Sequence, residues 1–455
     1  MEIQTRNPAT GKLIQTYDEM SDSDVTAIIT ATHQAFLSWR EMTIPERSKP
    51  IRRLAELLLE RKQDFAKLMA IEMGKPLAQG VAEIEKCAAT CNYYADVSAE
   101  YLQPRAIKTE MTKSFVTHEP IGLVFGIMPW NFPFWQVFRF AIPTMMAGNG
   151  ALLKHAPIST GTALVIEKLF ADAGCPQNVF RTLLISNETA ATVMAHPHVA
   201  AVTFTGSVAA GKIIAAEAGK ALKKTVLELG GCDAYLILED ANLELAATAC
   251  VASRMNNAGQ SCIAAKRLIV VETIKDKFIT LLHDKLATFI MGDPLIATTT
   301  IGPLARKDIR DHVHEQVQQS INKGAQLLMG GQVPATPGFY YPPTLISNVN
   351  KGMPAYEEEI FGPVIAVITA KNEEDAIAIA NGTSYGLGAG VFTRDIKRGE
   401  HIAAKKLQAG TCVVNTFVAS DPRLPFGGIK DSGYGRELAV EGILSFVNSK
   451  TVNVK

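Results

Sequence analysis

Apolar positions in the first hundred residues recur every three to four residues, which is the spacing of amphipathic helices. The helical pattern extends from about Ser21 to Gln103. Ser21 or Asp22 can cap the first helix,. That helix is expected to bury Val25, Ile28, Ile29, Phe36 and Trp39.

A second helix start is marked by Thr43, Pro45 and Glu46, which have the spacing of a capping box,. The helix that follows is expected to turn Leu54, Leu57 and Leu58 inward. Gly74 and Pro76 then supply a stop signal,.

From Ile121 onward, short apolar runs alternate with helical stretches. One helix is expected through Pro143 and another from about Thr160. Strands that alternate with helices favour βαβ units and a parallel sheet. The strands expected in this series are 121–128, 150–155, 199–205 and 226–231.

A second series of the same kind follows Cys262, so two α/β domains in tandem are expected,. A chain of 455 residues is also longer than one hydrophobic core usually serves,. The expected strands are 264–271, 361–368 and 388–393, with helices near 275–289 and 373–380. The stretch 445–455 reads as an extended tail, which must pair with another segment or with another subunit,.

Composition narrows the class of protein. The 45 basic and 45 acidic residues balance, which gives no support for a nucleic-acid or anionic-membrane partner. Seven cysteines in a chain of this size show no disulfide framework and favour a reducing compartment, so a cytoplasmic protein is expected,. The N-terminus lacks the features of a signal peptide,. Polar residues and three prolines interrupt the most apolar stretch, 121–153, which disfavours a membrane span,.

A glycine-containing turn at Gly206 and Ser207 links an expected strand to an expected helix. The N–H groups at such a helix start suit a phosphate, although a plain helix cap is the alternative. The spacing nearly matches a P-loop, but Ile213 stands where Ser or Thr should bind magnesium, so a nucleotide triphosphatase is disfavoured,.

A second glycine-rich segment, 385–390, is predicted to form a turn before a strand. Its sequence, YGLGAG, begins like a dinucleotide fingerprint, but the third glycine comes one residue early,. The chain contains no complete GxGxxG, so a dinucleotide would have to bind in an unusual way.

Cys262 differs from the other cysteines in its surroundings. It lies in a polar, glycine-containing turn, NNAGQSC, where a reactive thiolate could be stabilised,. A structural cysteine is the alternative, as Cys250 illustrates within an apolar run,. Glu228 ends a predicted strand ahead of two glycines and could face a cleft as a general base,. A surface acid at a turn is the alternative.

No metal site is expected. His196 and His198 flank a proline and lack further ligands,. Cys87 and Cys91, four apart on a helix, have no partner pair and are interpreted as packing residues.

Six segments carry a family resemblance when taken in order. They are EPIGLVFGIMPWNFPFW, FTGS, LELGG, NAGQSC, EEIFGPV and PFGGIKDSGYGRE. From about Pro8 to its C-terminus the chain resembles the aldehyde dehydrogenase superfamily. The implied fold is α/β, with an open-sheet dinucleotide-binding domain, an α/β catalytic domain and a small oligomerisation element. The implied bounds are 1–101 and 121–230, then 231–434, and finally 102–120 with 435–455.

The resemblance also implies roles for residues and a reaction. Cys262 matches the nucleophile, Glu228 the general base and Asn131 the amide that stabilises the oxyanion with the N–H of Cys262. Glu437 matches a proton relay. The residues matched to binding of NAD or NADP are Trp130, Lys154, Pro157, Thr205, Gly206, Ser207, Glu359 and Phe361. The thiolate would add to an aldehyde, hydride would leave to the nicotinamide, and water would hydrolyse the thioester.

Within the superfamily, the segments LLKHA and GQSCIAAKR look like the compact bacterial succinate-semialdehyde dehydrogenases. Arg139 matches the arginine that binds the substrate's carboxylate there. An arginine amid FWQVFRFAIP is costly unless paired, which favours an anionic ligand over a charge on a helix flank,. The residues matched to substrate binding are Arg139, Trp135, Phe132 and Ser261.

The sequence departs from the family pattern at two positions, and three alternative functions stay open. Phe140 stands where many members have lysine. Pro157 stands where many NAD-preferring members have an acid, so NADP should be tolerated. The rivals are an enzyme for uncharged aliphatic aldehydes, an acylating enzyme that does not hydrolyse its thioester, and a non-catalytic member. A homodimer or homotetramer is expected.

Overall fold

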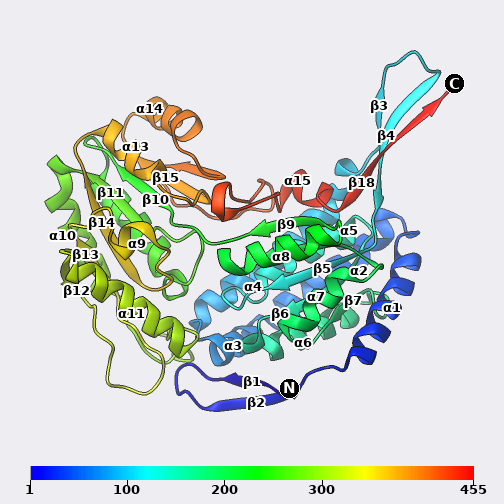
Figure 1. Cartoon of the computed structure of the whole chain (residues 1–455), viewed down its shortest axis with the longest axis horizontal. Helices are drawn as coiled ribbons and strands as arrows, with labels where there is room; N and C mark the ends of the chain where they lie inside the picture. The colour runs from blue at the N-terminus through cyan, green and yellow to red at the C-terminus, as the bar shows by residue number, and fades with distance from the viewer. Residues whose placement is uncertain (1) are drawn as a thin grey trace.

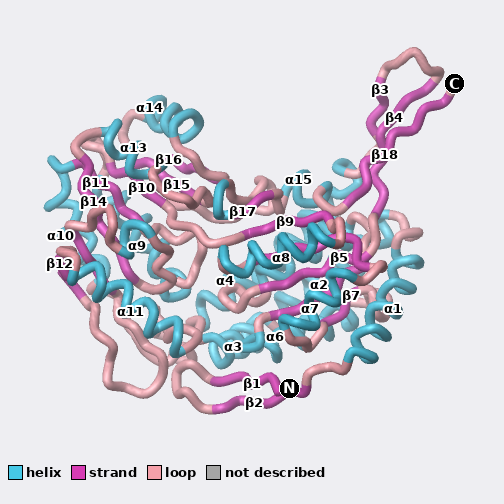
Figure 2. Tube along the Cα trace, viewed as in Figure 1, coloured by secondary structure: helices cyan, strands magenta, loops and turns pink. Residues whose placement is uncertain are grey.

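The computed structural model describes residues 2–455, which form two open α/β sheets and a small sheet that protrudes from the body (Figures 1 and 2). The first sheet has the strand order β17-β9-β8-β5-β6-β7 and is parallel except for β17. Its strands are β5 (Leu123–Met128), β6 (Gly150–His155), β7 (Phe180–Thr182), β8 (Val199–Thr205), β9 (Lys224–Glu228) and β17 (Gly433–Tyr434).

The strand order of this sheet places expected catalytic residues and expected cofactor residues at one edge. From β5 the chain passes to β6 on one side, whereas β8 and β9 lie on the other side. The carboxyl ends of strands beside such a reversal form a crevice where ligands bind in open α/β sheets. Asn131, Lys154, Gly206 and Glu228 all lie at or just beyond these carboxyl ends.

The second sheet has the order β12-β13-β14-β11-β10-β15-β16 and is parallel except for β12. Cys262 precedes β11, and Phe361 precedes β14, so the amino ends of these strands lead to the site. The strands are β10 (Ala234–Ile237), β11 (Arg267–Val271), β12 (Gln326–Met329), β13 (Thr344–Ser347), β14 (Val364–Ala370), β15 (Gly388–Phe392) and β16 (Thr411–Val414).

The N-terminal helices confirm the sequence-based predictions of caps and buried faces. Ser21 with Asp24 and Thr43 with Glu46 form capping boxes. Gly74 ends its helix in the left-handed region, at φ 83°. The predicted inward side chains are buried. The helices are α1 (Asp22–Trp39), α2 (Ile44–Glu60), α3 (Lys62–Met73) and α4 (Leu77–Tyr101), preceded by an unexpected hairpin of β1 (Glu2–Arg6) and β2 (Leu13–Asp18).

The later helices cover the two sheets (Figure 1). The helix expected to reach residue 289 ends at Leu286. The helices are α5 (Trp135–Met146), α6 (Thr160–Asp172), α7 (Asn187–Ala195), α8 (Val208–Lys220), α9 (Leu243–Met255), α10 (Lys275–Leu286), α11 (Lys307–Asn322), α12 (Pro354–Glu357), α13 (Glu373–Asn381), α14 (Ile396–His401) and α15 (Ala439–Leu444). None of the helices in residues 2–455 is both long and apolar enough to cross a membrane.

The C-terminal tail pairs within its own chain. β18 (Val447–Val454) lies antiparallel to β4 (Lys113–Pro120), which also pairs with β3 (Arg105–Ile107). These three strands form the protruding sheet, whose outer strands β18 and β3 each leave one edge open (Figure 1). β17 pairs with β9 of the first sheet, although residues 433–434 fall in the range 231–434 that was expected to be one unit.

β15 begins at Gly388, as the strand expected over 388–393 does, so the turn predicted over 385–390 is wrong in its second half. The two glycines serve close packing inside the strand. A Cβ at Gly390 would lie 2.5 Å from the ring of Tyr235, and one at Gly388 would lie 2.2 Å from the carboxylate of Asp233. The sequence shows that these positions are glycine, but it does not show which neighbouring side chains leave no room for a Cβ.

We predict that Gly390→Ala lowers the melting temperature, because overpacking a buried site costs about 1–3 kcal/mol. Thermal unfolding followed by circular dichroism measures the change. The control is Gly219→Ala in α8, where a Cβ meets nothing within 4 Å. Alanine in place of a helical glycine should stabilise by about 0.5–1 kcal/mol. Equal melting temperatures for wild type and Gly390→Ala would contradict the packing argument.

Candidate active site

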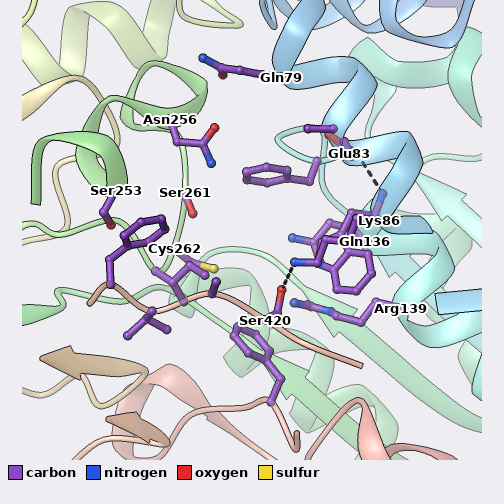
Figure 3. A pocket seen from close by; sticks show the side chains of 18 of the residues that line it. Gln79, Glu83, Lys86, Gln136, Arg139, Ser253, Asn256, Ser261, Cys262 and Ser420 are labelled. Carbon is purple, nitrogen blue, oxygen red and sulfur yellow. Dashed lines mark hydrogen bonds between the residues drawn. The ribbon is translucent and has the colours of Figure 1, made fainter. Parts of the chain in front are cut away.

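A cavity of about 370 Å³ lies between α4, α5 and the turn that carries Cys262 (Figure 3). Cys262 forms part of its wall, and the four residues expected to bind substrate line it too: Phe132, Trp135, Arg139 and Ser261. Further walls come from α4, from α5 and from the segment 417–420 that follows β16. The structure therefore brings the expected nucleophile and the expected substrate residues around one space.

The turn that carries Cys262 has an unusual backbone. Asn257, Ala258 and Gly259 have φ values of 53°, 53° and 75°, a left-handed run in a buried position. A Cβ at Gly259 would lie 2.1 Å from the carbonyl oxygen of Gly362, so the turn packs directly on the segment before β14. Only glycine fits both the backbone conformation and this contact.

Hydrogen bonds tie this turn to Asn131 at the end of β5. Asn257 Nδ2 donates to the carbonyl oxygen of Asn131 at 2.7 Å. Asn131 Nδ2 donates to the carbonyl oxygen of Gln260 at 3.1 Å. An amide has two N–H groups, so Asn131 keeps one donor for a further acceptor. A buried amide donor near the nucleophile is the group that an oxyanion requires.

The thiol of Cys262 is protonated in the resting site. Burial raises its pKa to about 12, although the positive charges of Lys266 and Arg139 lower it. The sequence predicted a thiolate favoured by a polar turn, but burial raises the pKa of the thiol by more than the neighbouring positive charges lower it,. The nucleophile therefore needs a proton acceptor.

Glu228 is the carboxylate that can take up a proton here. It ends β9 and is buried. Burial raises its pKa to about 8; Arg139 lowers the pKa and Glu437 raises it. A carboxyl group whose pKa lies near neutral pH is suited to act as a general base. Its charge also acts on the pKa of Cys262, so the two groups are electrostatic neighbours.

Arg139 forms a buried ion pair with Glu437. Its Nη2 also donates to Thr205 Oγ1 at 3.3 Å, and its guanidinium lies 4.8 Å from the centre of the Phe426 ring. The sequence analysis assigned this buried charge to an anionic ligand. In the structure Glu437 already balances it, so the burial of Arg139 does not require a ligand.

Glu437, the predicted proton relay, is close enough to Glu228 to raise its pKa. Burial also raises the pKa of Glu437 itself, while Arg139 and a hydrogen bond from Thr203 lower it. The two carboxyl groups and one guanidinium thus form a buried charged cluster. Its role in moving a proton stays a prediction.

Three of the expected cofactor residues, Glu359, Trp130 and Phe361, make contacts between segments of the two sheets. Glu359 accepts a hydrogen bond from the N–H of Gly231 at 3.1 Å and pairs with Lys266 at 3.2 Å. Trp130 and Phe361 lie edge to face, with ring centres 5.9 Å apart. Aromatic rings beside a fixed carboxylate can hold a ribose and an adjoining flat ring.

The remaining expected cofactor residues lie along the carboxyl edge of the first sheet. Burial lowers the pKa of Lys154, although the negative charges of Glu19 and Glu188 raise it. Ser207 caps α8 and accepts a hydrogen bond from the N–H of Ala210 at 3.3 Å. The start of α8 thus offers N–H groups and a positive dipole, a donor set that fits a phosphate.

Gly206 has a second reason to be glycine that the sequence did not show. A Cβ there would lie 2.4 Å from the ring of Phe204. Thr205 and Pro157 lie at the ends of β8 and β6, where the sequence analysis placed them.

Sequence reasoning missed several residues of the cavity wall. Phe426 lies inside the quoted PFGG segment and could have been found from it. Lys86, on α4, and Ser420 belong to no motif, so nothing local marks them. Lys266, which does not line the cavity, was also missed; it lies four residues after Cys262 and donates to the carbonyl oxygens of Ser261 and Cys262 at 2.8 and 2.6 Å. Within residues 2–455 no group of three or more His, Cys, Asp or Glu side chains could hold a metal ion.

The family assignment follows from comparison with known proteins. The sequence model of the aldehyde dehydrogenase family matches residues 1–452, and the chain belongs to that family. A probable succinate-semialdehyde dehydrogenase (NADP(+)) of Synechocystis sp. is 45% identical, with 99% of each chain covered. A succinate semialdehyde dehydrogenase (NAD(P)+) of Escherichia coli strain K12 is 43% identical, covering 98% of this chain and 96% of its own.

A solved structure gives the same fold. The succinic semialdehyde dehydrogenase of Streptococcus pyogenes, crystallised with NADP+ as the cofactor, superposes with a TM-score of 0.97. It is 36% identical to this chain, and 99% of each chain is covered. The resemblance inferred from the six motifs and the α/β fold expected from it are confirmed.

We predict that Glu228→Gln slows hydrolysis of the thioester more than its formation, because glutamine keeps the shape and loses the proton acceptor. Stopped-flow should show a surviving burst of reduced cofactor and a steady state lower by about 10²–10⁴-fold. In wild type the steady-state rate should rise as pH passes 8, where Glu228 becomes ionised. The variant should lose that rise.

Cys262→Ala is the matched comparison and should abolish both phases, whereas Cys412→Ala should leave both intact. Equal loss of burst and steady state in Glu228→Gln would show that Glu228 has another role.

Proposed function

We propose that this chain oxidises succinate semialdehyde to succinate with NAD(P)+, through a thioester on Cys262. The observation that carries the proposal is the cavity itself. Cys262 lines it together with two basic side chains, Lys86 and Arg139. The one acid of the wall, Glu83, is paired with Lys75, and the other lining residues are uncharged polar, aromatic or aliphatic. A short aldehyde with a terminal carboxylate matches such a space, and the relatives that carry this name support the choice.

The chemistry assigns one task to each group around Cys262. Glu228 accepts the thiol proton, directly or through water, and the sulfur adds to the aldehyde carbon. The free N–H of Asn131 donates to the oxyanion that forms. Loss of one such donor typically costs about 3–4 kcal/mol of barrier. The bound nicotinamide supplies the acceptor for the hydride that leaves the carbon.

The second half of the reaction releases the acid. Glu228 first releases the thiol proton to solvent. It then takes a proton from water, and the hydroxide attacks the thioester carbon. The carbon–sulfur bond breaks, and the proton returns to the sulfur of Cys262. The retained base at Glu228 argues against the acylating rival, in which the thioester is not hydrolysed.

The main alternative is oxidation of uncharged aliphatic aldehydes. Phe132, Trp135, Phe417 and Phe426 give the cavity a large aromatic surface, which favours such substrates. The two functions are distinguished by whether the enzyme prefers an aldehyde with a terminal carboxylate or one without it.

The expected homodimer or homotetramer is also part of the proposal. The protruding sheet has open strand edges at β3 and β18. An open edge exposes unpaired N–H and C=O groups, and covering it with another subunit satisfies them.

For succinate semialdehyde, kcat/KM should exceed that for butanal by about tenfold or more, because a charge-assisted hydrogen bond contributes roughly 1.5–3 kcal/mol. Butanal has the same four-carbon chain without the carboxylate. Steady-state assays with both aldehydes measure the ratio. Equal values, or a preference for butanal, would leave only the general aldehyde dehydrogenase activity.

NADP+ should be accepted at least as well as NAD+, because Pro157 brings no negative charge against a 2′-phosphate and Lys154 lies three residues before it, at the end of β6. The ratio of kcat/KM for the two cofactors checks this. A preference for NAD+ above about tenfold, or about 1.4 kcal/mol, contradicts it.

A further inference from the structure

Lys266 is a buried cation that contacts the turn carrying Cys262 without lining the cavity. It lies directly before β11. Its Nζ donates to the carbonyl oxygens of Ser261 and Cys262 at 2.8 and 2.6 Å and pairs with Oε1 of Glu359 at 3.2 Å. An ammonium group has three N–H donors, so these three acceptors use all of them. Lys266 is therefore committed to the protein and has no donor left for a substrate.

The contact with Ser261 fixes a peptide group that the reaction needs. The carbonyl oxygen of Ser261 and the N–H of Cys262 belong to one planar trans peptide, so the two point in opposite directions,. By holding that oxygen, Lys266 sets the direction of the Cys262 N–H, which is the donor expected to stabilise the oxyanion together with Asn131. A cation on the carbonyl side also polarises the peptide and strengthens its N–H as a donor.

Glu359 is held by the same ammonium group. Its Oε1 accepts from Lys266 and, at 3.1 Å, from the N–H of Gly231. A Cβ at Gly231 would lie 2.6 Å from the carbonyl oxygen of Cys262. A Cβ at Gly230 would lie 2.5 Å from Oε2 of Glu359. The two glycines thus leave room for this contact, and with Oε1 fixed on the protein, Oε2 is the oxygen that can accept from a ribose hydroxyl.

We propose that Lys266 is a positioning residue, which orients the oxyanion donor at Cys262 and the cofactor carboxylate Glu359 through one ammonium group. The nucleophile and the residue that holds the nicotinamide ribose are then kept in a fixed relation. The inference rests on the proposed function in taking Cys262 as the nucleophile. It holds for carboxylated and uncharged aldehydes alike.

The charges of this group act on the Cys262 thiol in opposite directions. Burial raises the pKa of Cys262 most. Lys266 and Arg139 lower that pKa, whereas Glu359 and Glu228 raise it. Removing the charge of Lys266 should therefore decrease the thiolate fraction, and removing the charge of Glu359 should increase it. Loosened packing would change the reactivity of both variants in the same direction, so opposite signs distinguish the two explanations.

The first test measures alkylation of Cys262 by iodoacetamide at pH 8, followed by mass spectrometry, in the full-length enzyme without cofactor. Lys266→Met should slow alkylation and Glu359→Gln should speed it, each by about threefold or more, which corresponds to a pKa change of roughly half a unit. Lys266→Arg keeps the charge and should react at nearly the wild-type rate. Lys285→Met is the matched control and should leave the rate unchanged, since Lys285 pairs with Glu244 and does not line the cavity.

The second test measures turnover and cofactor binding in the same variants. Lys266→Met should lower kcat by about tenfold or more for succinate semialdehyde and for butanal alike, because an oxyanion donor acts in the transition state. It should also raise the Kd for NADP+. Lys266→Arg should recover only part of kcat, because a planar guanidinium cannot reproduce three converging N–H bonds. Lys285→Met should match wild type in both measurements.

Two results would overturn the proposal. One is a folded Lys266→Met enzyme with wild-type kcat and wild-type NADP+ binding. The other is a Glu359→Gln enzyme that is alkylated more slowly than wild type, and this arm decides the matter even where Lys266→Met does not fold. Alkylation needs no aldehyde, so an enzyme without preference for succinate semialdehyde would refute that substrate and leave this inference standing. Full turnover after complete alkylation of Cys262 would refute both.

Discussion

The contact between Asn131 and the left-handed turn before Cys262 is the constraint on which the site depends. Asn131 ends a strand of one sheet, and Asn257 and Gln260 lie just before a strand of the other. The two hydrogen bonds fix the nucleophile against the carboxyl edge of the first sheet. They also fix the amide that must face the developing oxyanion, so the same contact sets both halves of the reaction geometry.

Buried ion pairs near Cys262 and Glu228 also hold the site in place. Glu359 pairs with Lys266, whose Nζ also donates to the carbonyl oxygen of Cys262. Arg139 pairs with Glu437 and lowers the pKa of both Glu228 and Cys262. Removing one partner of such a pair leaves an uncompensated charge, so these contacts constrain the site strongly. Changes at Arg139 should therefore reach Glu228 whatever the substrate is.

The sequence predicted what is local and missed what is distant. Caps, buried helix faces and the alternation of strands and helices depend on neighbouring residues, and the structure confirms them. The pairing of Arg139 with Glu437 joins residues on α5 and near the C-terminus, and no spacing rule connects them. Lys86 is similar, because its neighbours on α4 give no sign that it faces a cavity. The sequence left Gly388 and Gly390 in both a predicted turn and a predicted strand, because the ring and the carboxylate that exclude a side chain come from β10 and the segment before it.

The protonated state of Cys262 follows from the same burial that builds the cavity. A polar turn alone would favour a thiolate, but a low dielectric disfavours any unpaired charge. The thiol form is a poor nucleophile and is also slow to oxidise. The nearby Glu228, itself largely protonated below pH 8, can accept the thiol proton only in its ionised fraction. Arg139 lowers the pKa of Glu228 and so increases the ionised fraction. The ion pair between Arg139 and Glu437 therefore affects the strength of the base, although neither residue needs to touch the aldehyde carbon.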